Sequence, residues 1–454
     1  MWWINFNRVP KLLQTRAYII AISLMCGFCP ITAFAQEFVG EWRGKLEVAA
    51  QSISVTFDIQ KDTCNCFMAF MSIPEQGIRK LPVGVAIHDR TITFEIPEFD
   101  AKCCVTLLQK GCLIGSFFQR GLKIPLVMQN MESVASIRRQ TPRTPFPYKL
   151  EEVSFKNEKT GAVISGTLSL PQSPAPFSAV VLVSGSGSQD RDETLCGHKP
   201  FAVIADYLTR RGYAVLRYDD RGVGSSEIGK DDGTTASLSF DCESAVHFLQ
   251  NRNDISHIGI AGHSEGGTIA FMVASRCPVN FVISLASPFV CGKDLLKAQQ
   301  EAIFEAEGIL HDTNARKAMA LNDALFSYIC SHKSLDDIDK TDLLRLPELV
   351  GLTDEQKSGI LEEVLTPWFF EFLKSDPLQF VSKVAIPVLA LNGDKDLQVP
   401  AVQNLGALRN SVAGKNNFVI EEMPELNHLF QHCVTGLPSE YYDIDETIFY
   451  MTTP

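Results

Sequence analysis

A serine framed by glycines has the clearest chemical potential of any residue in this sequence. The segment Gly262-His263-Ser264-Glu265-Gly266 fits the pattern G-x-S-x-G. In that pattern the serine occupies a sharp turn between a strand and a helix, and the glycines let the turn close without a Cβ clash. The apolar stretch before it and the small-residue stretch after it supply the strand and the helix. We therefore predict that Ser264 is a nucleophile. Neighbouring side chains on such a turn point apart, so His263 is expected to pack beneath it.

A serine at neutral pH needs a general base, and the base needs a carboxylate that orients it. Around this kind of turn the chain order is serine, then Asp or Glu, then His. The loop after a predicted strand at 388–391 carries two aspartates; we favour Asp396 as the orienting acid and expect Asp394 to shape the turn. Two histidines follow. His428 comes just past a predicted strand and is the expected base, whereas His432 is expected to make a surface or cap contact.

The tetrahedral intermediate of acyl transfer needs hydrogen-bond donors for its oxyanion. One predicted donor is the backbone N–H of Glu265, directly after the nucleophile. The second is the N–H of Ser186, because it lies in the small-residue loop 184–192 that follows an apolar strand at 179–183. A merely flexible turn is the alternative for this loop. A phosphate-binding loop is not supported, because its Lys and Ser/Thr are absent.

The elements that must position these residues form an α/β domain at 148–454. Fully apolar strands alternate with amphipathic helices, a pattern that predicts a mostly parallel sheet covered by helices on both faces. An opening strand pair precedes this alternation. The predicted inner strands are 179–183, 213–218, 258–260, 281–285 and 388–391.

One stretch interrupts the alternation. Residues 292 to about 380 have helical periodicity and no convincing strand, which predicts a helical cap inserted over the carboxyl ends of the sheet. The cap carries an aromatic group that would line a pocket for a small acyl or alcohol group, formed by Trp368, Phe369 and Phe370. The alternative for each aromatic is that it holds the cap together.

A different pattern precedes the α/β domain. Residues 36–140 contain short runs in which polar and apolar residues alternate, such as 52–59 and 91–96. A period of two means one buried and one exposed face, so we predict an all-β antiparallel domain, a barrel or a sandwich. The proline-rich residues 141–147 are interpreted as the linker.

The first 35 residues have the pattern of a signal peptide. A basic start is followed by an apolar run too short to span a bilayer and by Ala33-Phe34-Ala35, a small-residue cleavage site. We therefore expect an exported protein, periplasmic or secreted, without stable membrane insertion after cleavage. Export permits disulfides, but the spacing of the remaining cysteines favours mostly buried thiols and matches no zinc site. A formal net charge of -12 disfavours nucleic acid as a partner.

Four motifs together resemble bacterial carboxylesterases of the α/β-hydrolase superfamily, which are related to dienelactone hydrolases and serine aminopeptidases. The motifs lie at 184–193, 218–226, 262–267 and 393–396. The resemblance implies hydrolysis of short-acyl esters with no metal and no cofactor, and a structural role for the turn at 221–224. The β domain resembles the companion domain of exported esterases. Such esterases end in a helix that packs on the sheet, and no amphipathic helix fits after Thr447.

These observations predict a serine hydrolase that cleaves small-molecule carboxylic esters through an acyl-serine intermediate. A serine peptidase or acyltransferase of the same fold is the first alternative. A glycan-binding relative without turnover is the second. The sequence does not fix the oligomeric state.

Overall fold

The computed structural model describes residues 38–449 except 49–50, 62–66, 74–77, 89, 110, 120–121, 131–137, 231–232, 350–356, 358–359, 363 and 443. The predicted signal peptide therefore lies outside the described residues. Among the described residues, those up to Arg139 form one compact unit together with Tyr441–Asp445, and Gln140–Glu440 form the other together with the residues from Glu446 onward. Residues 141–147 form neither helix nor strand. Within the described residues, no helix combines the length and apolar character needed to cross a membrane.

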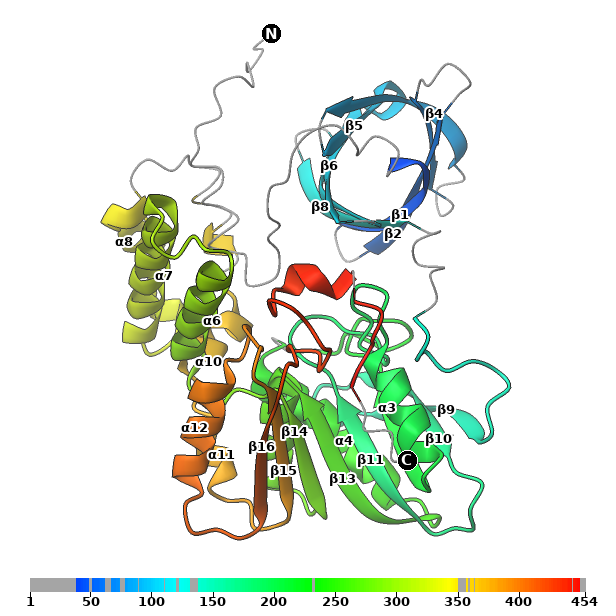
Figure 1. Ribbon diagram of the computed structural model, residues 1–454, viewed down its shortest axis with the longest axis vertical. Coiled ribbons are helices and arrows are strands. Elements are labelled where there is room, and N and C mark those ends of the chain that lie inside the picture. Colours follow the sequence, from blue (N-terminus) through cyan, green and yellow to red (C-terminus); the bar gives the residue numbers. More distant parts are fainter. Residues whose placement is uncertain are drawn as a thin grey trace. The chain divides into compact units, whose positions relative to one another are not determined.

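The first unit is a closed antiparallel barrel in which each strand pairs with the next and β8 closes on β1 (Figure 1). Alternation explains its core, because Ile92, Phe94 and Ile96 of one strand are fully buried while the residues between them face outward. Trp42 is also fully buried and donates its indole N–H to Phe38 O at 2.7 Å. The strands are β1 (Gly40–Val48), β2 (Gln51–Lys61), β3 (Phe67–Ile73), β4 (Ile78–His88), β5 (Thr91–Ile96), β6 (Ala101–Gln109), β7 (Cys112–Gln119) and β8 (Leu122–Asn130).

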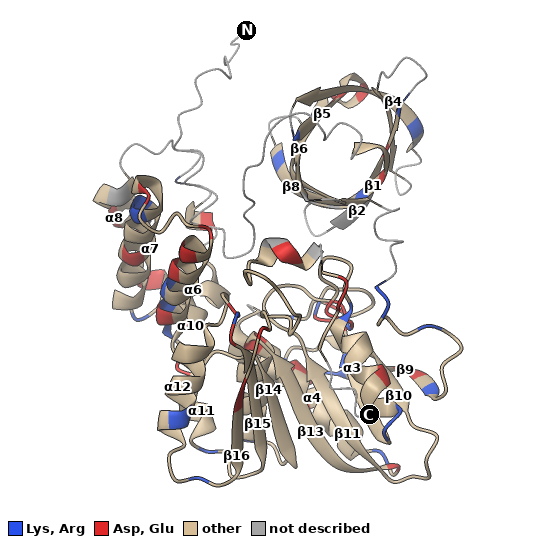
Figure 2. Ribbon diagram, in the orientation of Figure 1, with Lys and Arg blue, Asp and Glu red and all other residues tan. Residues whose placement is uncertain are grey.

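The second unit is built on an eight-stranded sheet in the order β16-β15-β14-β13-β11-β12-β10-β9. Only β10 runs opposite to its neighbours, and the other pairings are parallel. Figure 2 shows β11, β13 and β14 without a charged residue, as expected for strands buried on both faces. The strands are β9 (Lys149–Lys156), β10 (Val163–Leu170), β11 (Phe177–Val183), β12 (Tyr213–Tyr218), β13 (Ile255–His263), β14 (Phe281–Leu285), β15 (Val388–Gly393) and β16 (Phe418–Met423).

Helices cover both faces of this sheet. On one face α3 (Pro200–Thr209) packs on Val180 and Leu182. On the other face α4 (Thr235–Gln250), α5 (Glu265–Ala274) and α12 (Ala401–Ser411) share a core with Ala179 and Val181. Alternate side chains of β11 therefore lie in two different hydrophobic cores, one on each face of the sheet. The predicted α/β-hydrolase fold is confirmed, as is the separate all-β domain.

Helices also fill the interval between β14 and β15, where the sequence predicts the cap. They are α6 (Gly292–Ala306), α7 (Thr313–Ser331), α8 (Lys340–Leu343), α10 (Pro367–Lys374) and α11 (Leu378–Val381) (Figure 1). The first four share their own hydrophobic core. After β16 the described residues form a short 3-10 helix, Pro438–Tyr442, and Ile448 packs beside Val203 of α3.

Candidate active site

The turn that carries Ser264 joins β13 directly to α5. Ser264 adopts φ +52° and ψ -122°, a conformation that a side chain disfavours and that marks stored backbone strain. The flanking glycines are sterically required. A Cβ on Gly262 would lie 2.0 Å from Gly266 O, and a Cβ on Gly266 would lie 2.2 Å from Val183 O. The G-x-S-x-G pattern is thus explained by the close approach of backbone to backbone.

The predicted acid and base meet across neighbouring loops. Asp396 follows β15, His428 follows β16, and His428 Nδ1 lies 2.8 Å from Asp396 Oδ2. Both side chains are buried. The other carboxylate oxygen of Asp396 accepts the backbone N–H groups of Gln398 and Val399, each at 2.8 Å. A carboxylate held this way requires the proton of His428 on Nδ1, which leaves Nε2 as the basic nitrogen.

The competing candidates occupy different positions. Asp394 is exposed, and its N–H bonds to Met423 O, so it belongs to the turn itself. The half-exposed ring of His432 pairs with Glu446 at 2.9 Å. His263 is buried beside the nucleophile, and its ring contacts Glu193 and the backbone of His428.

The predicted oxyanion donors lie on either side of the nucleophile. Glu265 is the first residue of α5, so its N–H has no partner within the helix. Ser186 is exposed, and its N–H makes no hydrogen bond within the described part of the chain. Its loop passes close to the nucleophile, since a Cβ on Gly185 would lie 3.1 Å from Ser264 Cβ.

Two aspartates that the sequence analysis left without a role fix this loop. Asp220 accepts the Ser184 hydroxyl at 3.1 Å and the Gln189 N–H at 2.9 Å. Asp219 accepts hydrogen bonds from both the backbone N–H and the guanidinium of Arg191. The motif at 218–226 therefore fixes the loop that is predicted to supply an oxyanion donor. A sequence signal exists, because two adjacent acids directly follow the mostly buried strand β12.

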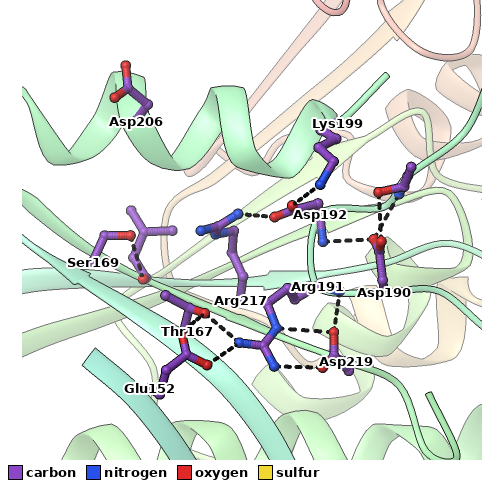
Figure 3. Close-up of polar contacts among 12 residues, drawn as sticks. Glu152, Thr167, Ser169, Asp190, Arg191, Asp192, Lys199, Asp206, Arg217 and Asp219 are labelled. Carbon is purple, nitrogen blue, oxygen red and sulfur yellow. Dashed lines mark hydrogen bonds and ion pairs between the residues drawn. The ribbon is translucent and has the colours of Figure 1, made fainter. Parts of the chain in front are cut away.

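Figure 3 shows how the loop is tied to the sheet. Arg191 also contacts Glu152 and Thr167, on β9 and β10. The next residue, Asp192, pairs with Arg217 of β12 and with Lys199.

The three cap aromatics differ in their surroundings. Trp368 donates its indole N–H to Glu265 Oε1 at 2.9 Å, so it reaches the residue after the nucleophile. Phe369 is buried in the cap's own core, against Phe326. Phe370 is half-buried, with Lys374 Nζ 4.4 Å from its ring centroid. Phe369 thus has the position of a residue that holds the cap together.

The described residues include nine cysteines, of which four are buried and five are partly exposed. Cys103 and Cys242 are buried thiols, and burial raises the pKa of each well above its ordinary value. In the parts of the chain that the structure describes, no three His, Cys, Asp or Glu side chains gather as metal ligands.

Comparison with known proteins agrees with this architecture. A family model described as serine aminopeptidase, S33 matches residues 197–429, just over half of the chain. Esterase EstD of Thermotoga maritima is 26% identical over 347 residues, which are 76% of this chain and 72% of that protein. An acyl transferase of Photobacterium leiognathi is 26% identical over 145 residues, covering 31% of this chain and 45% of its own. Among solved structures, a Pyrococcus furiosus esterase matches with 16% identity and a TM-score of 0.41, over 61% of this chain and 83% of that one.

Proposed function

Because the chain belongs to the serine aminopeptidase S33 family of hydrolases, we propose that it is a carboxylesterase that cleaves short-acyl esters through an acyl-serine intermediate. The observation that carries the proposal is the 2.8 Å contact between His428 and the buried Asp396, on loops that leave adjacent parallel strands. The similarity to esterase EstD supports ester cleavage as the reaction.

In the first half of the reaction, Ser264 Oγ attacks the ester carbonyl carbon while His428 Nε2 takes its proton. Asp396 stabilises the imidazolium that forms. Its second oxygen is already held by two backbone N–H groups, so the carboxylate does not have to reorganise. The N–H groups of Ser186 and Glu265 donate to the oxyanion of the tetrahedral intermediate.

The intermediate collapses when the alkoxide leaves and takes the proton from His428. This releases the alcohol and leaves the acyl group on Ser264. A water molecule then attacks the acyl carbonyl while His428 takes its proton. The second intermediate collapses when Ser264 Oγ leaves and takes this proton back from His428, which releases the carboxylic acid and restores the enzyme.

The family description makes an aminopeptidase the second candidate. Such an enzyme needs an acidic group that binds the amine of the substrate. Two carboxylates beside the turn at Ser264, other than Asp396, have other partners. Glu265 accepts Thr235 and Trp368, and Glu193 accepts Gly185 and His263. This favours the ester over the peptide. We expect a higher kcat/KM for p-nitrophenyl acetate than for alanine p-nitroanilide, and the reverse order would support the peptidase.

The decisive experiment is Ser264→Ala assayed on p-nitrophenyl acetate. Removing a triad member costs roughly 10⁴-fold or more in kcat, and labelling by a fluorophosphonate probe should be lost with it. Ser275→Ala is the matched control, because Ser275 lies at the other end of α5 and bonds to Met272 O. A folded Ser264→Ala protein as active as wild type would exclude the mechanism. Folded wild type that neither turns over nor takes up the probe would favour a binding protein.

We further propose that the protein is exported and that cleavage after Ala35 leaves Gln36 as the first residue. The basic, apolar and small-residue regions at 1–35 support this. N-terminal sequencing of protein from the periplasm or medium tests it, and an intact Met1 terminus on cell-associated protein would contradict it.

A further inference from the structure

A second buried acid and histidine lie beside the catalytic pair and have no role in the reaction described above. Glu193 and His263 are 5% and 7% exposed, and Glu193 Oε1 lies 2.9 Å from His263 Nδ1. Glu193 also adopts φ +52°, a left-handed conformation that costs a residue with a side chain about 1 kcal/mol or more. Strain and buried charge at one position indicate a functional constraint.

One oxygen of Glu193 serves two partners. Besides His263, Glu193 Oε1 accepts the backbone N–H of Gly185 at 2.8 Å. Gly185 lies directly before Ser186, whose N–H is the proposed oxyanion donor. Because Ser184 is fixed by Asp220, the Glu193 contact is what orients the next peptide of the loop.

His263, the other member of the pair, contacts the backbone of the proposed base, His428. His263 Nε2 lies 2.9 Å from the backbone oxygen of His428. A carbonyl oxygen only accepts hydrogen bonds, so Nε2 must carry a proton. With the Glu193 carboxylate facing Nδ1, a proton is required there as well. The ring that satisfies both contacts is an imidazolium balanced by Glu193.

The charges that surround the ring are consistent with this state. Burial opposes the charge and lowers the pKa of His263, but the charge of Glu193, its hydrogen bond and the bond to His428 O outweigh burial. The pKa of His263 is raised as a result, and the charge of Asp396 acts in the same direction. The groups that face the ring are thus Glu193 after β11, Asp396 after β15 and His428 after β16.

The pair must also be neutral as a whole. The rings of His263 and His428 have centroids only 4.7 Å apart, and His428 becomes positively charged as it takes the serine proton. A lone imidazolium at that distance would oppose this step. The carboxylate of Glu193, 2.9 Å from His263 Nδ1, offsets the charge of that ring.

We propose that Glu193 and His263 are positioning residues that hold the oxyanion loop at Gly185 and the base-bearing loop at His428 in register with each other. Neither touches substrate. The inference rests on the proposed ester hydrolysis. The segment that carries Glu193 is suited to this task, because Arg191 and Asp192 tie it to β9, β10 and β12 (Figure 3).

Glu193→Gln tests the proposal with little change of shape. A neutral Gln cannot balance an imidazolium, so His263 keeps one ring proton and loses one of its two contacts. We expect kcat on p-nitrophenyl acetate to fall about 10- to 100-fold while KM changes by less than about threefold. Glu243→Gln is the matched control, because it makes the same change at a partly buried carboxylate that pairs with Arg276 at 2.7 Å and contacts neither His263 nor Gly185. It should keep kcat within about threefold of wild type. A Glu193→Gln enzyme with the kcat of that control would overturn the proposal.

A spectroscopic measurement tests the pair without relying on turnover or on the folding of Glu193→Gln. Ser264→Ala protein labelled with ¹⁵N-histidine should show two protonated ring nitrogens for His263 at a pH just above the ordinary histidine pKa of about 6.5, assigned by their absence in a His263→Asn variant. A neutral His263 ring in folded protein would refute the ion pair. Wild type that fails to hydrolyse esters while His263 is doubly protonated would instead reject the proposed function and leave the pair intact.

Discussion

Replacement of Trp368 by Phe isolates one bond between the cap and the nucleophile turn. The Trp368 indole N–H donates to Glu265 Oε1 at 2.9 Å, and the indole stacks on Phe372 with centroids 5.1 Å apart and planes at 11°. Phenylalanine keeps a stacking ring and loses the donor. Because Glu265 follows Ser264 directly, the bond connects α10 to the start of α5.

The expected loss in free energy of unfolding depends on which hydrogen bonds remain in the Trp368→Phe variant. A hydrogen bond to a charged acceptor is worth about 1.5–3 kcal/mol. Glu265 would keep its bond to Thr235 Oγ1 at 2.5 Å, and Glu371 of α10 would keep its bond to Ala236 N–H at 2.8 Å. The free energy of unfolding should therefore fall toward the lower end, by about 1.5 kcal/mol. With one of these two hydrogen bonds of α10 gone, the cap should be held less firmly over the substrate, and KM for a butyryl ester should rise roughly 3- to 10-fold with a smaller change in kcat.

Urea denaturation and steady-state kinetics on acetyl and butyryl esters measure these effects. Tyr328→Phe is the control, because it removes a hydroxyl that bonds to Asp339 O at 3.3 Å inside the cap. It should leave KM unchanged. If Trp368→Phe matches this control in KM, the bond to Glu265 does not control the cap, and the reasoning fails even if stability falls.

Two further predictions concern strain and pH. Ser264→Gly should be more stable to urea than Ser264→Ala by about 1 kcal/mol, because glycine accepts φ +52° while alanine retains the strain; equal stability would argue against a strained turn. Burial of the carboxyl, with Glu193 and Asp241 nearby, raises the pKa of Asp220 to about 7 against the lowering effect of its bonds to Gln189 and Ser184. The folded state then binds this proton more tightly than the unfolded state. The free energy of unfolding should therefore fall as the pH rises from about 4 to about 7, by at most about 1.4 kcal/mol per pH unit. Asp220→Asn should remove that slope in urea titrations at several pH values, and an unchanged slope would assign it to other groups.

The sequence predicts most of the α/β unit because its signals are local. Apolar runs bounded by turn residues predict β12 and β14 with their observed bounds. In the β unit, alternation predicts individual strands but not how the sheet ends. The choice between barrel and sandwich depends on pairing such as Trp42 with Asn130, and no short stretch of sequence contains that information.

The same limit applies to the site. Ser264, Asp396 and His428 can be proposed because each follows a recognisable strand in a fixed chain order. The contact of Glu193 with His263 joins residues 70 positions apart, and nothing in the period or spacing of either segment indicates it. The pocket role suggested for Phe369 shows a related difficulty, since aromatic composition does not distinguish a lining residue from one buried in the cap's core.

The charged residues of the shared motifs therefore have a physical explanation that is separate from the triad. Within 190–193, Asp190 binds the N–H groups of Asp192 and Thr194, and each following charged side chain binds another element. These contacts set the position of backbone donors, which any ester needs in the same place. We expect substrate choice to depend instead on the cap, whose helices have a core of their own and reach the turn at Ser264 through α10. Similarity in the four motifs should thus predict the reaction well and the alcohol or acyl group poorly, because the two properties reside in segments with different cores.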